Sequence, residues 1–297
     1  MVDTVANALA AVAELKGVGL RQCRHGPMLY LLNDRPIATA LEAYGEWSEG
    51  EIGLLSRWVR PGDTVVEAGA NIGTHTVPLA KLAGPSGRVV AIEPQRMMYQ
   101  LLGGNLALNR LGNVDTYRVA VSDKPGPIDI PSVDYFGQVN NYSAMPLEDA
   151  RNRKGYAGLD FETVPAITID SLKLRTVRLI KMDVEGMEPQ ALRSARYLIE
   201  RTRPILYLEA DRPENYPLLA GLLRKYGYQA WWHVVPLFSP GNFAGAAASQ
   251  TGSLNSLNIV CFPIGSEYEP PTPPQSFLDY VDKFGPTLPM LSGGAVE

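Results

Sequence analysis

Short apolar runs rich in β-branched residues alternate with amphipathic stretches along the centre of the chain. Between most of the apolar runs, hydrophobic residues recur at helical spacing. Near-continuous apolar strands that alternate with helices are typical of a parallel sheet covered on both faces, so we expect an α/β domain. The five apolar runs are TVVEAG, GRVVAIEP, VDTYRVAVSD, VRLIKMD and RPILYLEAD, and the helical stretches include HTVPLAKLA, MMYQLLGGNLALNRL and MEPQALRSARYLIERT.

The flanking segments add further elements to this pattern. Residues 4–16 predict a surface helix, and the run MLYLL at 28–32 predicts a short strand. Ser48 stands three residues before Glu51, which is the spacing of a capping box at the start of a helix. Towards the C-terminus, PLLAGLLRKYGYQAWWHVV predicts a helix followed by a strand, and LNIVCFP predicts the last strand.

Two segments interrupt the alternation and set the expected boundaries. Residues 131–165 form a long polar connection of the kind that serves as a lid or binding loop, and the tail after Pro263 is rich in proline, which favours an extended arm over packed secondary structure. We therefore expect an N-terminal extension at 1–60, a catalytic domain at 61–263 and a C-terminal arm at 264–297. Either the extension or the arm could join copies of the chain into a homo-oligomer.

Composition excludes several classes of protein. The 297 residues are 45% hydrophobic and 20% charged, which is ordinary for a folded globular chain and rules out wholesale disorder. The formal charge of -4 gives no basis for binding a nucleic-acid backbone. Cys23 and Cys261 are too few for a disulfide framework, so we expect reduced, buried thiols. No apolar run is long enough for a membrane span, and Asp3 stands where a secretory signal carries positive charge, so we expect a cytoplasmic protein without a membrane partner.

The ends of the predicted parallel strands carry the candidate chemistry, because ligands of such sheets bind outside the carboxyl ends of the strands. A loop of small residues after the first strand lets the backbone approach a ligand at the start of a helix. Asn71 and Thr74 stand where a dinucleotide fingerprint needs glycine, and Glu67 would repel a pyrophosphate but attract the amino group of S-adenosylmethionine. The candidate cofactor loop comprises Glu67, Gly69, Ala70, Asn71, Gly73 and Thr74.

The next two strand ends extend this candidate cofactor site. Glu93, followed by Pro94, ends the second strand 26 positions after Glu67, where a carboxylate can accept both ribose hydroxyls. The third strand is expected to end at Ser122 and Asp123, which suit an adenine amino group. The alternative for these acids is that they are ordinary solvated carboxylates at strand ends.

Three blocks of this sequence resemble the FkbM family of S-adenosylmethionine-dependent methyltransferases. They are VVEAGANIGTHTVPLA, VVAIEPQRMMYQLLGGNLALN and TIDSLKLRTVRLIKMDVEGMEPQALRSARYLIERTRPILYLEAD, in family order and spacing, and the match covers roughly residues 44–263. The resemblance implies a class I methyltransferase fold, a Rossmann-like three-layer sandwich around a mostly parallel seven-stranded sheet with the last strand antiparallel. It also implies S-adenosylmethionine as cofactor and O-methylation of a small molecule, often a sugar or natural product.

Methyl transfer needs a positioned acceptor and a group that removes its proton. Asp183 follows the fourth strand and is the first candidate for orienting or deprotonating the acceptor. Alternation along the strand puts Lys181 on the same side, so the two can pair and keep Asp183 ionised. Glu185 and Glu188 fall three residues apart as a helix begins, where either of them can simply stabilise the helix N-terminus.

More acids follow the fifth strand. Glu209 and Asp211 are expected to face the same cleft as Asp183 and Glu185, where these carboxylates could jointly hold a hard divalent cation, although the family resemblance does not itself imply a metal.

The three histidines of the sequence are candidate bases. His233 could face the acceptor pocket or could be a half-buried structural imidazole. His75 is expected to pack beside the cofactor, and His25 has no argument for a site. Asn242 and Asn258 match polar positions of one branch of the family, but an asparagine in a loop is often a turn former.

The predicted loop at 131–165 mixes aromatic and amide side chains that suit a polyhydroxylated acceptor, and its alternative is a solvated insertion. These side chains are Tyr135, Phe136, Asn140, Asn141, Tyr142 and Ser143.

The leading hypothesis is therefore a small-molecule O-methyltransferase. Alternatives are an N-methyltransferase or a methyltransferase of a protein or lipid, an NAD-dependent reductase, and a binding protein that keeps the cofactor fold without catalysis.

Overall fold

The computed structural model describes residues 17–137 and 159–289. Its centre is a seven-stranded sheet with the strand order β11-β12-β10-β9-β3-β4-β5. Neighbouring strands are parallel except that β12 runs antiparallel to both β10 and β11. The predicted mostly parallel sheet with an antiparallel last strand is confirmed. The strands are β3 (Thr64–Ala68), β4 (Arg88–Ile92), β5 (Val114–Tyr117), β9 (Leu179–Met182), β10 (Ile205–Glu209), β11 (Tyr228–Pro236) and β12 (Asn255–Pro263).

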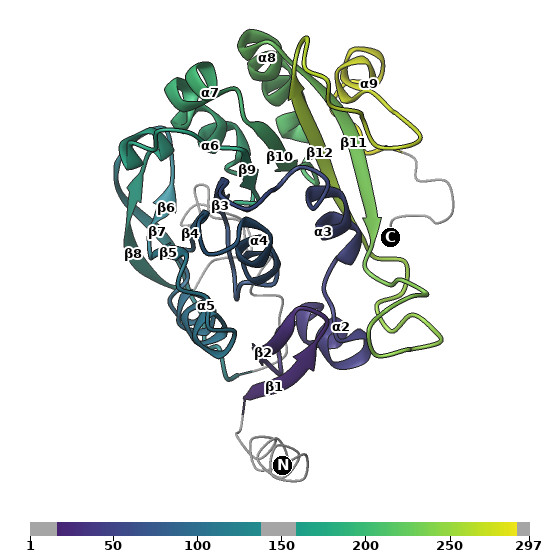
Figure 1. Ribbon diagram of the computed structural model, residues 1–297. Helices are drawn as coiled ribbons and strands as arrows, with labels where there is room; N and C mark the ends of the chain where they lie inside the picture. The colour runs from purple at the N-terminus through teal and green to yellow at the C-terminus, as the bar shows by residue number, and fades with distance from the viewer. Residues whose placement is uncertain (1–16, 138–158, 290–297) are drawn as a thin grey trace.

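Helices cover both faces of this sheet, as Figure 1 shows, so the fold has three layers. On one face α3 and α4 pack apolar residues such as Leu55 and Leu79 against the strands, and on the other face α6, α7 and α8 contribute Leu192, Ile199 and Leu223. The helices are α2 (Ile37–Tyr44), α3 (Glu49–Leu55), α4 (Thr76–Ala83), α5 (Arg96–Leu108), α6 (Glu188–Ser194), α7 (Arg196–Thr202), α8 (Tyr216–Tyr226) and α9 (Phe277–Phe284), with short 3-10 turns η3 (Ile169–Leu172) and η4 (Pro213–Asn215).

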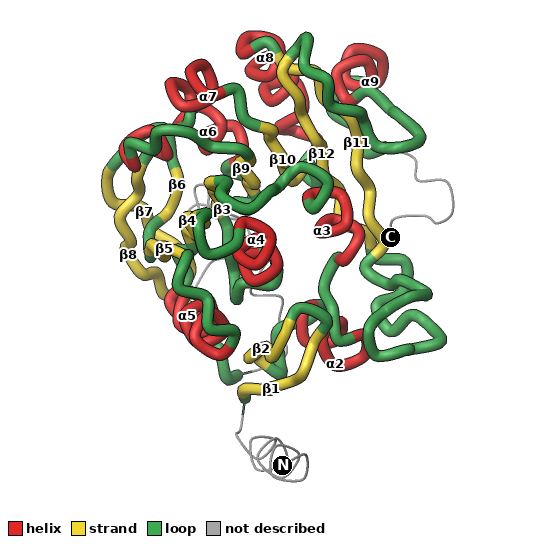
Figure 2. Tube along the Cα trace, in the orientation of Figure 1, coloured by secondary structure: helices red, strands yellow, loops and turns green. Residues whose placement is uncertain are grey.

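A second sheet departs from the sequence prediction. The run 114–123 was expected to be one strand, but β5 ends at Tyr117 and the chain bends away to form β6 (Ala120–Val121). β6 pairs with β8 (Asp160–Ile167), which also pairs with β7 (Gly126–Ser132). The ends of the predicted loop at 131–165 therefore belong to a three-stranded sheet, visible beside β5 in Figure 2. Three prolines in β7 and β8 hid this pairing, because proline is rare in strands other than edge strands.

The N-terminal extension folds over one end of the main sheet. The strand expected at 28–32 is the second arm of a hairpin, β1 (Val18–Cys23) and β2 (Gly26–Leu31). The Tyr44 hydroxyl, at the end of α2, lies 3.1 Å from the Thr251 hydroxyl and accepts the backbone N–H of Thr251 at 2.9 Å. The long connection between β11 and β12 is thereby held against the extension, and Figure 1 shows the two side by side.

The C-terminal tail contains packed structure that the sequence reading did not anticipate. The tail was expected to form an extended arm, yet α9 packs on β11 through Phe277, which has no exposed surface. The ring of Phe277 meets that of Trp232 at 5.1 Å. Pro270, Pro271, Pro273 and Pro274 precede α9, and no proline lies within it. Ser276 caps the helix by accepting the backbone N–H of Asp279.

Two smaller expectations concern cysteines and membranes. Cys23 and Cys261 are buried and free, as expected. No helix within 17–137 or 159–289 is both long and apolar enough to cross a membrane.

Candidate active site

The carboxyl ends of β3, β4, β9 and β10 surround a cavity of about 350 Å³, a volume suited to a small-molecule ligand. Its walls come from three parts of the chain. The strand ends supply the polar side, the N-terminal extension adds Ile37 and Trp47, and the connection between β11 and β12 adds Leu237 and Leu254. The cavity lining thus combines polar and apolar side chains.

The loop after β3 passes very close to the end of β9. Gly69 has a φ of +84°, and a Cβ placed on it would lie 1.6 Å from the carbonyl oxygen of Asp183. Only glycine fits this position, both for its backbone conformation and for lack of space. The N–H groups of Gly69 and Ala70 both donate to the carbonyl of Ile92, which holds the loop against the end of β4. Gly69, Ala70, Asn71 and Thr74 line the cavity.

Glu93 lies on the cavity wall beside this loop and is 5% exposed. Its Oε2 accepts the backbone N–H of Asn71 at 2.9 Å, and its Oε1 accepts that of Gln95 at 2.8 Å. Burial raises the pKa of Glu93 to about 7, with the two backbone donors opposing the rise and the charge of Asp183 adding to it. The carboxyl is held in place and faces the cavity, with Pro94 next to it.

Glu67 lies behind the cavity wall and does not line it. The side chain is 1% exposed and accepts a hydrogen bond from the Thr76 hydroxyl at 2.7 Å. Burial raises its pKa, while Lys181 opposes the rise. Gly73, also named from the sequence, has a φ of +91° and packs against Leu102, away from the cavity lining.

Lys181 and Asp183 form the ion pair expected from strand alternation. Lys181 Nζ lies 2.9 Å from Asp183 Oδ2, and Lys181 is only 1% exposed. Burial disfavours its charge, but Asp183, Glu51 and Glu67 outweigh this effect and raise its pKa. One oxygen of Asp183 is therefore held by a buried ammonium at the cavity wall.

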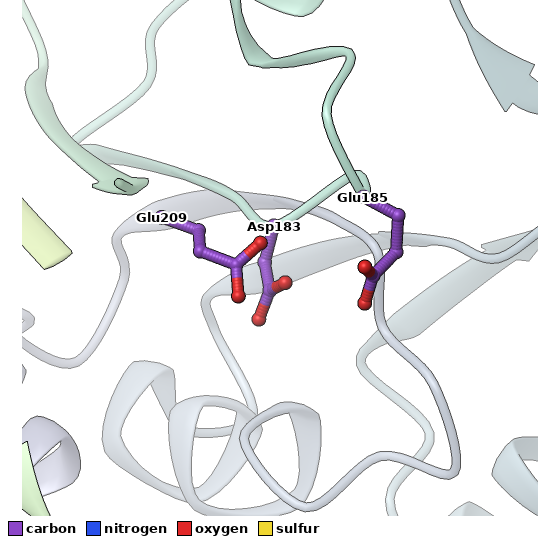
Figure 3. Close-up of side chains that lie close together, drawn as sticks. All are labelled: Asp183, Glu185 and Glu209. Carbon is purple, nitrogen blue, oxygen red and sulfur yellow. The ribbon is translucent and has the colours of Figure 1, made fainter. Parts of the chain in front are cut away.

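Further acids meet at the ends of β9 and β10. The carboxyl groups of Asp183, Glu185 and Glu209 point toward one another in Figure 3, with one oxygen of each within 4.8 Å of the others. Arg212 lies 2.6 Å from Glu185 and 3.4 Å from Asp211. Burial raises the pKa of Glu185 and of Glu209 well above the usual range, and the charge of Asp183 adds to both shifts.

Glu188, the first residue of α6, binds the backbone of the turn that precedes this helix. Its Oε1 accepts the backbone N–H groups of Val184 at 3.2 Å and Gly186 at 3.0 Å. This is the structural alternative raised from the sequence, stabilisation of the turn that begins α6. Burial raises its pKa to about 7.

Glu51 is a site residue that sequence reasoning missed. The spacing from Ser48 was interpreted as a capping box, but Ser48 makes no side-chain bond to the helix backbone and instead donates to Glu51 Oε1 at 2.6 Å. Glu51 is 3% exposed, lines the cavity and lies 3.3 Å from His75 Nε2. Burial opposes its ionisation, yet His75 and Lys181 lower its pKa overall. The sequence does offer one signal for a buried Glu51, because this acid directly precedes Ile52, which is also buried in α3.

The adenine contacts expected at Ser122 and Asp123 are not part of the cavity lining. Asp123 is instead ion-paired with Arg193 at 2.5 Å. Because the chain bends after β5, residues 119–121 form this part of the wall.

His233 also lies outside the residues that line the cavity. Its Nδ1 is 2.8 Å from the Tyr207 hydroxyl, and burial lowers its pKa. Asn258 pairs with His233 across β11 and β12, and Asn242 bonds within its own loop to Ser239 and Ala246. None of these three residues lines the cavity, although Asn258 is also the strand partner of Glu209.

His25 lies 2.8 Å from Glu49 in the N-terminal extension and has no place in the cavity. The expected acceptor contacts of Asn140, Asn141, Tyr142 and Ser143 lie outside the described residues, while Tyr135 and Phe136 do not line the cavity.

Comparison with known proteins places this site in a family context. The model of the methyltransferase FkbM domain matches residues 67–230. Methyltransferase sdnD of Sordaria araneosa is 28% identical over 156 residues, which are 43% of this chain and 59% of that protein, so the similarity spans less than two thirds of the relative.

Solved structures give similar matches. Methyltransferase FkbM of Methylobacillus flagellatus has 17% identity and a TM-score of 0.43, covering 71% of this chain and 50% of that one. M. jannaschii TYW2, solved in complex with AdoMet, has 14% identity and a TM-score of 0.44, covering 83% and 85%.

Proposed function

The chain belongs to the FkbM methyltransferase family, and from this premise we propose that it methylates a hydroxyl oxygen of a small molecule with S-adenosylmethionine as methyl donor. The observation that carries the proposal is the meeting, in one cavity, of a glycine-containing loop, a buried acid after β4 and a carboxylate cluster after β9 and β10. The first two suit a nucleoside, and the third suits an acceptor that must lose a proton.

The residues present fit the cofactor. The close approach of Gly69 to β9 leaves the loop backbone on the cavity surface, with no side chain at that point. Glu93 offers two fixed oxygens to the ribose hydroxyls, and residues 119–121 are the candidate wall for the adenine ring. The bound cofactor supplies a methyl group already activated by a positively charged sulfur. The acidic surroundings favour that charge, whereas they would repel the pyrophosphate of NAD.

Asp183 is the proposed acceptor-orienting residue. Lys181 holds its Oδ2, so the carboxylate keeps a set direction and presents its other oxygen to a hydroxyl. Glu209 lies on the same cavity wall, with a carboxylate oxygen within 4.8 Å of one of Asp183, and is the candidate for taking the proton. Asp183 thus orients the hydroxyl and Glu209 accepts its proton.

The acceptor itself is proposed to be a sugar or a glycosylated natural product. Ile37, Trp47 and Leu254 line the same cavity as the acids, which suits an acceptor with both a hydroxyl group and an apolar face. A cytoplasmic location is part of this proposal, since both cysteines are free and buried.

Calorimetry tests the cofactor half. We expect S-adenosylmethionine and S-adenosylhomocysteine to bind and NAD to give no heat, and tight NAD binding without a signal from the other two would overturn the proposal. A screen of glycosylated alcohols with methyl-labelled S-adenosylmethionine tests the acceptor half. Mass spectrometry of the product should place the label on an oxygen atom of a small molecule. A label on nitrogen, or on a protein or lipid, would contradict the proposed acceptor.

A further inference from the structure

We propose that Asp183, Glu185 and Glu209 form a binding site for a hard divalent cation, Mg²⁺ or Mn²⁺. The site lies in the cavity described above, so the inference rests on the proposed function for its chemical role. Its existence can be measured without any acceptor.

The spacing of the three carboxylates matches a shared cation. One oxygen from each side chain lies within 4.8 Å of the other two. Oxygen ligands stand about 2.1 Å from Mg²⁺ and about 2.4 Å from Ca²⁺, so ligands of one ion are about 3 Å apart when neighbouring and about 4.2–4.8 Å apart when opposite. The three oxygens are therefore close enough to share one ion, and Figure 3 shows their carboxyl groups close together.

A second observation, independent of the spacing, points to a missing positive partner. Oε2 of Glu209 has no exposed surface and accepts no hydrogen bond from any residue in the described part of the chain. The same holds for Oδ1 of Asp211, which follows two residues later on the same cavity wall. A buried acceptor without a donor is costly, and native structures rarely leave one unmatched. Figure 3 shows the Glu209 carboxyl aimed at Asp183.

The basic side chains of Lys181 and Arg212 each bind one oxygen of a neighbouring carboxylate. Lys181 Nζ bonds to Oδ2 of Asp183 at 2.9 Å, and Arg212 bonds to Oε2 of Glu185 at 2.6 Å. In each pair the second carboxylate oxygen receives no bond from another described residue. Groups that hold one oxygen of a ligand and leave the other free are typical of the surroundings of a metal.

The charges around the cluster also favour a cation. Four acids, Asp183, Glu185, Glu209 and Asp211, face two basic side chains, and Lys181 is shared with Glu51 and Glu67. Without a further positive charge, ionised carboxylates this close together repel one another.

The ligand set determines the kind of cation. All three donors are carboxylate oxygens, and none of the described residues in the cluster is a histidine or cysteine. Such a set selects Mg²⁺, Mn²⁺ or Ca²⁺ over zinc and copper. In the cavity, such an ion would lower the pKa of a coordinated acceptor hydroxyl.

The test uses Mn²⁺ alone as probe on the full-length protein after treatment with a chelator. Titration followed by electron paramagnetic resonance should give one saturable Mn²⁺ site per chain, displaced by excess Mg²⁺. Glu209→Gln and Glu185→Gln should each weaken Mn²⁺ binding by about ten-fold or more. Glu200→Gln, which changes an exposed acid paired with Arg196, is the matched control and should bind like wild type. Circular dichroism confirms that each variant is folded.

Binding of S-adenosylhomocysteine, measured on the same samples, separates this inference from the proposed function. If S-adenosylhomocysteine binds but Mn²⁺ does not saturate at millimolar concentration, protons satisfy the acids and the cation site is refuted while the methyltransferase proposal stands. If the folded Glu209→Gln and Glu185→Gln variants both bind Mn²⁺ as tightly as wild type, the proposed site is also refuted. Saturable binding lost in both variants and kept in Glu200→Gln supports it, whether or not S-adenosylhomocysteine binds.

Discussion

Replacing Glu93 by glutamine removes a buried negative charge while keeping the size of the side chain. In the wild type, both oxygens accept backbone N–H groups and the side chain is 5% exposed. Burial raises the pKa from 4.5 to about 7. This difference corresponds to about 3 kcal/mol between the two protonation states.

The sign of the effect on stability follows from the direction of the shift. The folded protein binds the Glu93 proton more tightly than the unfolded chain, so this contribution to stability is fully present below pH 4.5. It is lost as the pH rises from 4.5 through about 7. The Glu93→Gln variant cannot lose a proton, so its free energy of unfolding should gain about 3 kcal/mol relative to wild type between pH 4 and pH 8.

A constant offset is expected in addition, because glutamine offers one carbonyl oxygen to two backbone donors. Only the pH-dependent part therefore tests the reasoning, and urea unfolding at pH 4, 5, 6, 7 and 8 measures it. The control is Glu200→Gln, which lies on the surface. A difference between Glu93→Gln and wild type that stays constant over this range would refute the raised pKa.

The same variant tests the proposed contact with ribose. Loss of a hydrogen bond to a charged group costs about 1.5–3 kcal/mol, so affinity for S-adenosylhomocysteine should fall roughly 10- to 150-fold at pH 8. Wild-type affinity should rise between pH 5 and 7 with release of a proton, seen by calorimetry in buffers of different ionisation enthalpy. Unchanged affinity in the variant would mean that another residue holds the ribose.

Three further predictions concern the loop after β3 and the candidate acceptor residues. Gly69→Ala should lower the melting temperature severely or prevent folding, since the added Cβ would lie 1.6 Å from the Asp183 carbonyl oxygen. The control Gly103→Ala, in open space on α5, should stabilise the protein by up to about 1 kcal/mol. Equal melting temperatures of the two variants would contradict the close approach at Gly69. Asp183→Asn should reduce turnover about 10²-fold through loss of acceptor orientation, while affinity for S-adenosylhomocysteine, measured by calorimetry, changes little. His233→Ala should leave turnover within a few fold, because this side chain bonds to Tyr207 outside the cavity lining; loss of activity together with the acid limb of the pH–rate profile would instead make His233 the base.

Much of the fold and part of the site follow from local sequence pattern. Apolar β-branched runs of strand length, separated by helical periodicity, require a parallel sheet with both faces covered, and the ends of parallel strands necessarily meet at one edge. The places of Glu93 and Asp183 at strand ends therefore predict their position on the cavity wall. The pair of Lys181 with Asp183 followed from alternation alone, because residues two apart on a strand share a side.

The tertiary structure decided which distant side chains meet. Asp123 also follows a strand, but a bend after Tyr117 carries it to Arg193, so its position in the sequence was not sufficient. Glu51 reaches the cavity from α3, a helix whose direction is set by packing against the sheet rather than by the spacing of Ser48 and Glu51. Periodicity reports which side of an element is buried, whereas the partner of a buried charge depends on how separate elements pack, and that information is not local.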